Sequence, residues 1–441
     1  MRFSFSWLRD YLETSETPES IGEALTDLGL EIESLINPKT RLIDLTVGEI
    51  LSFDKHPNAD KLKVCRVKTS DNILNIICGA PNVKKGMKVV VAKPGNFIPG
   101  LNITLKKSEI RGVQSDGMMC SEKELEISDE HEGIIELPKG AEVGTSYSSL
   151  VDENKIFFEI AITPNRPDAL GVFGIARDLA ARGLGVLKPA KHETFKEDFV
   201  SNLNIELDES VKGKECPFFV GRSIKNVTNA ESPQWLKQRL ESIGLKPISA
   251  LVDITNYITF DRGRPLHVFD ADKISGDLRV RKSFAGEKFH ALDEKIYDLD
   301  AGMTVIVDEK EIISLGGIIG GLNSSVSRET KNVLLEAAYF EPISIASTGR
   351  KLKINSDARY RFERGIDPSF TVPGNNIATK MILDICGGRA SKPVIAGADP
   401  KPNKEVLFNP QKVNNLIGIN INLEDQKSIL TSLGFIVDDK K

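Results

Sequence analysis

Glu336 and His267 are the two side chains in this sequence whose surroundings suggest chemistry. Glu336 lies inside an otherwise apolar run, Val333-Leu334-Leu335-Glu336-Ala337-Ala338. A carboxylate buried in such a run must be paired, hydrogen-bonded or protonated, because burying an isolated charge is costly. His267 follows Pro265-Leu266 and allows three interpretations: a general base, a hydrogen-bond donor or a satisfied core histidine. A structural partner for Glu336 and a core position for His267 remain the alternatives to a reactive site.

A second feature is a concentration of positive charge between residues 55 and 93. Residues 55 to 68 contain five lysines or arginines against one acid, Asp60, and residues 84 to 93 add four lysines and no acid. Basic side chains on a small β-domain can follow a phosphate backbone. The alternative is a solvated charged face. Since these two stretches contain no aromatic residue for base stacking, sequence-specific readout is not expected.

The whole-chain composition limits the possible functions. The 441 residues carry a formal net charge of −5, so any nucleic-acid contact must come from a local patch. No apolar run is long enough to span a membrane, and the early Arg2 and Arg9 argue against a secretory signal. Five widely spaced cysteines without a C-x-x-C motif disfavour disulfides and structural zinc, which fits a cytoplasmic protein. We predict no metal site.

The N-terminal third must supply the elements that carry the basic residues. Trp7, Leu8 and Tyr11 share one helical face, and Thr17-Pro18 predicts the start of a second helix that ends at Gly29. Five short β-runs then predict a small barrel or sandwich. They cover residues 45–51, 63–67, 73–78, 87–92 and 103–106.

The remaining chain must position Glu336 and His267. Residues 203–390 have a mixed α/β pattern, in which Ser232 is expected to cap a helix that ends at Gly244. Other expected elements are strands at 157–162, 278–280, 304–307, 312–315 and 406–408, and helices at 171–182, 375–386, 410–416 and 424–433. Polar residues 188–202 and proline-rich residues 398–402 are expected to be linkers.

Several motifs together resemble one family. Val47-Gly48-Glu49-Ile50, residues 56–62, Ile77-Cys78-Gly79-Ala80-Pro81-Asn82 and Met118-Met119-Cys120-Ser121-Glu122 are similar to the tRNA-binding oligonucleotide-fold module of bacterial phenylalanyl-tRNA synthetase β subunits. Residues 159–168, 252–257, 263–270, 316–321, 333–338 and 356–365 resemble later segments of the same β subunits. The resemblance covers Trp7 to Phe435 and corresponds to the N-terminal half of such a subunit.

The resemblance implies roles for particular residues in an editing site. Glu336 would read the hydroxyl of tyrosine that is wrongly attached to phenylalanine tRNA, a discrimination of roughly 10⁴-fold. His267 would position the terminal adenosine or the hydrolytic water, and the tRNA ribose hydroxyl is an alternative activator of that water. The other implied editing residues are Gly320, Ser356, Ala358, Thr255, Asn256 and Lys246, with Ser356 replacing the usual threonine and Lys246 the usual arginine. The implied tRNA-binding residues are Lys55, His56, Asn58, Lys61, Lys63, Arg66, Lys84 and Lys85.

The resemblance also implies an α+β multidomain fold. Residues 1–39 would pack with 151–190, residues 40–150 would form the oligonucleotide-fold β-barrel, 203–390 a B3/B4-type editing domain, and 403–441 an incomplete B5-type domain. The implied partners are the synthetase α subunit, in an (αβ)₂ heterotetramer, and tRNA(Phe); no membrane or DNA is expected. ATP and Mg²⁺ would serve the holoenzyme at sites outside this segment.

No amino-acid activation site is predicted in the chain itself. Gly316 to Gly321 lacks both the P-loop ending and the G-x-G-x-x-G spacing, so a bent strand or a close approach of substrate are the interpretations left open. Tyr360-Arg361-Phe362-Glu363 mimics one class II synthetase motif, but its glycine-rich companion is missing. The alternative function is a free-standing tRNA-binding protein with an editing-like domain and no ligase activity.

Overall fold

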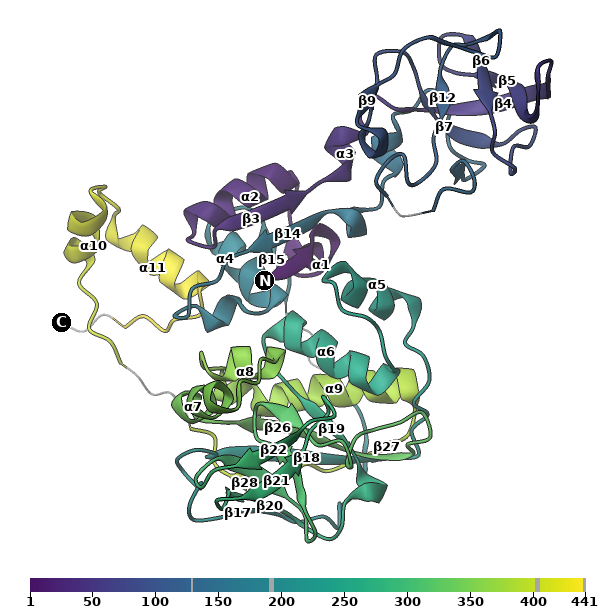
Figure 1. Cartoon of the computed structure of the whole chain (residues 1–441). Helices are drawn as coiled ribbons and strands as arrows, with labels where there is room; N and C mark the ends of the chain where they lie inside the picture. The colour runs from purple at the N-terminus through teal and green to yellow at the C-terminus, as the bar shows by residue number, and fades with distance from the viewer. Residues whose placement is uncertain (128–129, 190–193, 401–404, 439–441) are drawn as a thin grey trace. The chain divides into compact units, whose positions relative to one another are not determined.

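The computed structural model describes residues 1–127, 130–189, 194–400 and 405–438. The chain divides into two compact units (Figure 1): unit 2 comprises Ile36–Ile156, and unit 1 comprises Met1–Leu35 together with Phe157–Lys441. The described helices are all too short or too polar to cross a membrane. A mixed α/β multidomain fold was expected and is confirmed. The finer boundaries at 40–150, 203–390 and 403–441 stay predictions.

Unit 2 is built on a six-stranded sheet in the order β12-β7-β4-β5-β6, with β13 also paired to β7. Its strands are β4 (Thr46–His56), β5 (Ala59–Lys68), β6 (Ile73–Cys78), β7 (Lys88–Ala92), β12 (Met118–Met119) and β13 (Glu136–Leu137). Outside the sheet lie α3 (Pro38–Arg41) and the hairpins β8 (Phe97–Ile98) with β9 (Ile103–Thr104) and β10 (Ser108–Ile110) with β11 (Val113–Ser115).

Strand β7 explains how this sheet is held. Val89 and Val91 pack into one apolar cluster, and Val90 and Ala92 pack into another, so the strand is buried on both faces. The predicted strand at 103–106 is wrong in extent, because β9 ends at Thr104 and pairs with β8 rather than with the main sheet.

Unit 1 begins with a small layer of strands and helices. The sheet β1-β14-β3 and the pair β2-β15 lie with three helices in this part of the unit. The elements are β1 (Arg2–Ser4), α1 (Phe5–Tyr11), β2 (Leu12–Glu13), α2 (Pro18–Asp27), β3 (Ile32–Ile36), β14 (Phe157–Ile160), α4 (Val172–Ala181) and β15 (Val186–Leu187). As predicted, the Thr17 side chain accepts the N–H of Ser20 at the start of α2, and Gly29 has a positive φ of 77° just after its end.

The main body of unit 1 stacks two sheets. The first has the order β16-β27-β18-β26-β19, with β28 on β18, and the second has the order β17-β20-β23-β24-β25. The first comprises β16 (Glu197–Phe199), β18 (Phe218–Lys225), β19 (His267–Asp270), β26 (Asn332–Tyr339), β27 (Arg389–Ser391) and β28 (Val394–Gly397). The second comprises β17 (Ile205–Leu207), β20 (Leu278–Lys282), β23 (Thr304–Val307), β24 (Ile312–Leu315) and β25 (Ile319–Gly320), near the hairpin β21 (Glu287–His290) and β22 (Ile296–Leu299).

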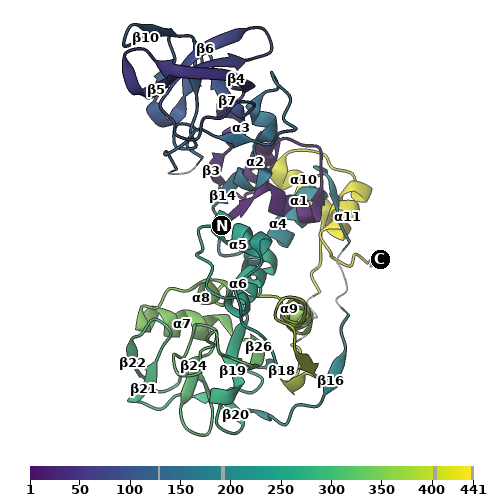
Figure 2. The same cartoon turned by 90° about the vertical axis from the view of Figure 1, so that its right-hand side faces the viewer.

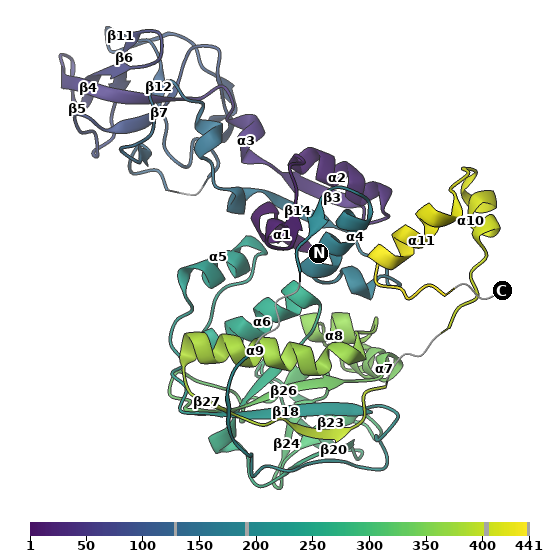
Figure 3. The same cartoon turned by 180° about the vertical axis from the view of Figure 1, so that it is seen from behind.

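Helices cover one face of the first sheet. α6 (Ala250–Arg262) and α9 (Thr371–Cys386) pack there, and α9 runs across β18 and β26 (Figure 3) and is seen nearly end-on beside them in Figure 2. An apolar cluster joins the opposite face to the second sheet. The other helices of this unit are α5 (Gln234–Ser242), α7 (Pro342–Leu352), α8 (Asp357–Phe362), α10 (Pro410–Ile417) and α11 (Leu423–Ser432).

Three local predictions for unit 1 are corrected. Pro233, not Ser232, is the N-cap of α5, and the Ser232 hydroxyl donates to Asp253 Oδ2 at 2.5 Å. Part of the expected linker 188–202 is strand β16, which pairs with β27. Residues 406–408 form no strand, and Leu407 is 95% exposed there. In the two expected linkers, residues 190–193 and 401–402 lie outside the described residues.

Candidate functional site

The register of the first sheet brings the two candidate reactive side chains together. On neighbouring antiparallel strands, His267 of β19 lies directly opposite Glu336 of β26. Directly opposite residues have Cβ atoms about 4.5–5.5 Å apart. Both side chains point away from α6 and α9, because they alternate with Val268 and Leu335, which pack against those helices. The pair therefore faces the space between the two sheets.

Glu336 is a buried carboxyl in apolar surroundings. It is 6% exposed, and its neighbours on the same face of β26, Leu334 and Ala338, belong to the apolar cluster between the sheets. Its pKa is shifted by burial alone, with no contribution from a hydrogen bond or a charge of another described residue. Burial raises the pKa of Glu336 to about 8, because the charged form is poorly solvated there. Near neutral pH the group is mostly protonated and can both donate and accept a hydrogen bond.

His267 is held as a neutral imidazole. Burial lowers its pKa to about 4, and its Nε2 atom is buried without a hydrogen-bond partner among the described residues. The ring packs edge-to-face on Phe269 with a centroid separation of 4.4 Å. A Cβ atom on Gly320 would lie 2.3 Å from the ring's Cε1 and 2.6 Å from Nε2. Residue 320 must therefore be glycine for the imidazole to occupy this place beside β25.

Ser356 and Ala358 lie at the start of α8, next to the glycine-rich segment. The Ser356 hydroxyl donates to the Ile318 carbonyl at 2.6 Å and accepts the Arg359 N–H at 3.0 Å, which makes it the N-cap of α8. Ala358 packs against the apolar cluster between the sheets. Ser356 thus fixes the backbone two residues before Gly320. Its hydroxyl is engaged in these two bonds, so its role in lining a pocket stays a prediction.

The three remaining predicted editing residues lie in or before α6. The Thr255 hydroxyl donates to the Val252 carbonyl at 2.8 Å within the helix, and Asn256 is half-buried beside it. Lys246 is exposed in the loop before the helix. Since α6 packs on the sheet face that Glu336 and His267 point away from, the structure does not bring these three residues together with that pair. Their part in the site stays a prediction.

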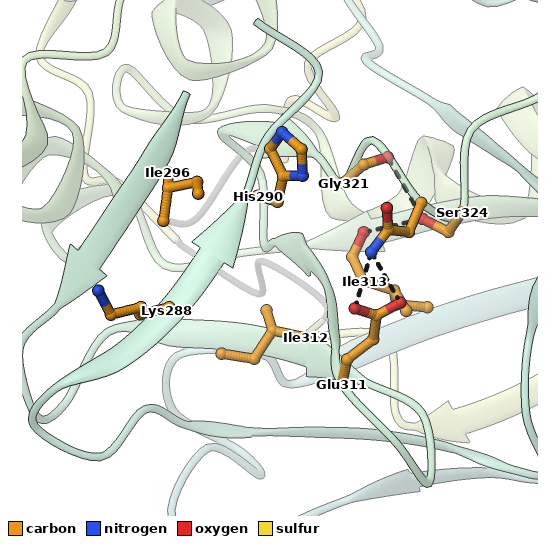
Figure 4. Close-up of a pocket in the computed structure, with 9 residues that line it drawn as sticks. Lys288, His290, Ile296, Glu311, Ile312, Ile313, Gly321 and Ser324 are labelled. Carbon is orange, nitrogen blue, oxygen red and sulfur yellow. Dashed lines mark hydrogen bonds between the residues drawn. The ribbon is translucent and has the colours of Figure 1, made fainter. Parts of the chain in front are cut away.

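A small cavity lies close to this region (Figure 4). It has a volume of about 150 Å³ and is lined by residues of β21, β22, β24 and the turn after β25. Glu311 and Asn323 both line it, and the Asn323 amide donates two hydrogen bonds to the Glu311 carboxylate. Gly321, which follows Gly320, belongs to the lining, whereas Glu336 and His267 do not. A wider groove of about 610 Å³ follows β20 and the β23–β24 turn, and its lining does not include Glu336 or His267 either.

Most predicted nucleic-acid residues of unit 2 are accessible. Lys55, Lys61 and Arg66 are exposed on the β4–β5 hairpin, and Lys84 and Lys85 are exposed in the loop before β7. Elsewhere in the basic region, Lys88 and Lys93 are paired with Glu49 and Asp71 at 2.8 and 3.0 Å. The region of free positive charge is therefore smaller than the sequence suggests.

His56 is corrected from a surface contact to a structural residue. It is 5% exposed, its Nδ1 accepts the Asn58 N–H at 3.1 Å, and its Nε2 lies 3.0 Å from the Ile110 carbonyl. Because Nδ1 accepts the hydrogen bond from Asn58, Nε2 carries the ring hydrogen and donates it to the Ile110 carbonyl. The Asn58 amide in turn donates to the Arg111 carbonyl at 2.9 Å. These two residues tie the hairpin to the β10–β11 turn.

The sequence analysis missed Phe53. This side chain is 37% exposed on β4, and the Lys63 Nζ atom lies 5.2 Å from its ring centroid. It precedes the basic stretch by two residues, and only the pairing of β4 with β5 places it beside Lys63. The available signal was an aromatic residue between the predicted strand at 45–51 and the basic stretch that starts at Lys55.

The described residues were compared with the side-chain groups that hold metal ions in proteins. Within the described ranges, no group of three or more histidine, cysteine, aspartate or glutamate side chains is arranged to hold a metal ion. The five cysteines are buried and free. Burial raises the pKa of Cys120 to about 12, so this thiol stays protonated near neutral pH.

Comparison with known families defines the class of protein. A model of the B3/4 domain matches residues 215–387, and a model described as "Putative tRNA binding domain" matches residues 45–146. The two models match separate segments of the chain, and the candidate pair lies in the segment that matches the B3/4 domain.

The similar curated proteins narrow this class. A phenylalanine–tRNA ligase β subunit from Ruegeria pomeroyi is 53% identical over 440 residues, and one from Paramagnetospirillum magneticum is 49% identical over 438; each alignment covers 99% of this chain and 55% of the relative. The chain is homologous over nearly its whole length to phenylalanine–tRNA ligase β subunits and spans about half the length of these relatives. This confirms the resemblance. A solved N-terminal fragment of the β subunit from Pyrococcus horikoshii is 17% identical, with a TM-score of 0.31, covering 65% of this chain and 79% of that one.

Proposed function

We propose that this chain is part of a phenylalanine–tRNA ligase β subunit that binds tRNA(Phe) and hydrolyses tyrosine wrongly attached to it. Unit 2 would be an oligonucleotide-fold barrel, and the two stacked sheets of unit 1 an editing domain. The partner would be the α subunit in a cytoplasmic (αβ)₂ heterotetramer, which catalyses aminoacylation with ATP and Mg²⁺. The described residues offer no metal-ligand group for that ion. The chemistry that we assign to this chain is ester hydrolysis.

The observation that carries the proposal is the buried carboxyl of Glu336, which lies in apolar surroundings opposite His267. An apolar pocket that merely tolerates a phenyl ring cannot reject the analogue with one extra hydroxyl. A buried polar group that needs a partner makes the opposite selection, because the phenol hydroxyl satisfies it and a plain phenyl ring leaves it unsatisfied. Such a site can favour tyrosine by about 10⁴-fold. Glu336 in its protonated form has the donor and the acceptor that a phenol requires.

His267 is assigned a positioning role. An imidazole with a pKa of about 4 is a weak proton acceptor near neutral pH, since an effective general base has a pKa near the working pH. Its unpartnered Nε2 can still form one hydrogen bond, to the hydrolytic water or to the terminal adenosine. The water oxygen forms a bond to the acyl carbon, the ester bond to the ribose oxygen breaks, and the water proton ends on that leaving oxygen. The neighbouring free ribose hydroxyl of the tRNA end is our candidate to relay this proton.

The test compares two substrates. The purified chain is incubated with tyrosyl-tRNA(Phe) and, separately, with phenylalanyl-tRNA(Phe), and release of the amino acid is followed with time. We expect tyrosine to be released and phenylalanine to be retained. Equal release of tyrosine and phenylalanine would contradict the proposed role of Glu336 in editing. Binding of the tRNA without any release would favour a tRNA-binding protein that has lost hydrolytic activity.

A further inference from the structure

Phe53 is a partly exposed aromatic side chain on strand β4 of unit 2. It lies on β4 opposite Cys65 of β5, and 37% of its surface is exposed. The ammonium of Lys63 sits 5.2 Å from the ring centroid, a cation–π contact that helps to hold the ring in position.

Two positively charged side chains lie opposite each other near this ring. Lys55 of β4 lies directly opposite Lys63 of β5, a cross-strand pairing that is unfavourable unless something negative neutralises it. Neither lysine has an acidic partner among the described residues. Of the acids on β4, Asp54 alternates to the face opposite Phe53 and Lys55, and Glu49 is paired with Lys88. The face that carries Phe53 therefore presents two cations beside an aromatic ring, and Asp54 lies on the opposite face.

We propose that Phe53, Lys55 and Lys63 form an RNA-binding subsite in which Phe53 stacks on an unpaired base and the two lysines contact the flanking phosphates. The choice of tRNA as the RNA rests on the proposed function. Every base has a π-face, so stacking of this kind tolerates any sequence, and flanking lysines add affinity that depends on salt. Charge complementarity favours a polyanion over an apolar protein surface, because an apolar partner would leave two opposed ammonium groups unneutralised. The Phe53 side chain is 37% exposed, so part of the ring is accessible to a base.

The test measures binding of the full 441-residue chain to a tRNA(Phe) transcript by fluorescence anisotropy at several salt concentrations. We expect Phe53→Ala to weaken binding by about 5- to 150-fold, which corresponds to about 1–3 kcal/mol. The slope of log affinity against log salt should stay unchanged for this variant, and Phe53→Trp should bind like the wild type. Phe97→Ala is the matched control, since Phe97 is 45% exposed on β8 of the same unit. The double change Lys55→Ala/Lys63→Ala should reduce the slope by about 1.4–1.8.

The outcomes separate this proposal from the proposed function. If Phe53→Ala binds like the wild type while the lysine variant is weakened, the stacking role is wrong and tRNA binding stands. Equal weakening by Phe53→Ala and Phe97→Ala would also refute the subsite, because the effect would then be general. If the wild-type chain binds no tRNA, both the Phe53 subsite and the proposed tRNA-binding function are wrong. Circular dichroism of each variant establishes that the fold is retained.

Discussion

The stability of unit 1 should depend on pH through Glu336, and the size of this effect follows from its burial. The pKa of about 8 lies about 3.5 pH units above the ordinary value of 4.5. Each pKa unit corresponds to about 1.4 kcal/mol, so ionising this carboxyl in the folded state costs about 5 kcal/mol in total. Because the folded-state pKa is raised, the contribution of the protonated group is fully present below pH 4.5 and is lost as the pH rises to about 8.

The Glu336→Gln variant removes this titration while keeping the shape of the side chain. Its gain in unfolding free energy over the wild type should be about 1 kcal/mol at pH 5 and about 5 kcal/mol at pH 9, as the linkage relation gives for pKa values of 4.5 and 8. Urea unfolding followed by tryptophan fluorescence measures it. The two tryptophans, Trp7 and Trp235, both belong to unit 1, so the signal reports on that unit.

The control for this experiment is Glu209→Gln, because the Glu209 side chain is 88% exposed. Its unfolding free energy should follow that of the wild type at every pH. If the difference between Glu336→Gln and the wild type stays constant from pH 5 to pH 9, Glu336 is already ionised in the folded chain throughout this range, and the description of a buried, mostly neutral carboxyl is refuted.

Two further predictions concern the residues around His267. Gly320→Ala should displace the imidazole, since the new Cβ would lie 2.3 Å from its Cε1. We expect deacylation of tyrosyl-tRNA(Phe) to be at least tenfold slower, with unchanged tRNA affinity. An unchanged deacylation rate would show that the position of the ring is irrelevant. Ser356→Ala should lower the unfolding free energy of unit 1 by about 1–2 kcal/mol, because it removes the α8 cap and the hydrogen bond to Ile318. Ser356→Thr should keep most of this free energy. Fluorescence-detected unfolding measures both variants, and equal stability of the two would contradict the capping role.

Elements that depend on neighbouring residues were predictable from the sequence. The Thr17-Pro18 start of α2 is an example, because a capping side chain and a proline act within one helical turn. Ser232 looks equally good in the sequence, yet its hydroxyl is drawn to Asp253, 21 residues later in the chain. No local rule contains that contact. The same limit explains the wrong strand at 406–408, which has the composition of a strand but no partner strand in the described residues.

The candidate site shows a similar division. The apolar run around Glu336 was enough to mark an unusual carboxyl, and its burial is confirmed. Its opposition to His267 depends on the register between β19 and β26, which is set by long-range packing. Phe53 was missed for the same reason, since the pairing of β4 with β5 creates its contact with Lys63. His56 could not be recognised as buried, because its partner Ile110 comes from another hairpin.

The most direct measurement of the central claim is the ratio of initial deacylation rates for tyrosyl-tRNA(Phe) and phenylalanyl-tRNA(Phe), compared between the wild type and Glu336→Ala. Both chains are first matched for fold by tryptophan fluorescence, and Glu209→Ala serves as the exposed-carboxylate control. We predict a wild-type ratio of up to about 10⁴ that falls close to one in Glu336→Ala and is unchanged in the control. A Glu336→Ala chain that is folded and still prefers tyrosine as strongly as the wild type would contradict the account.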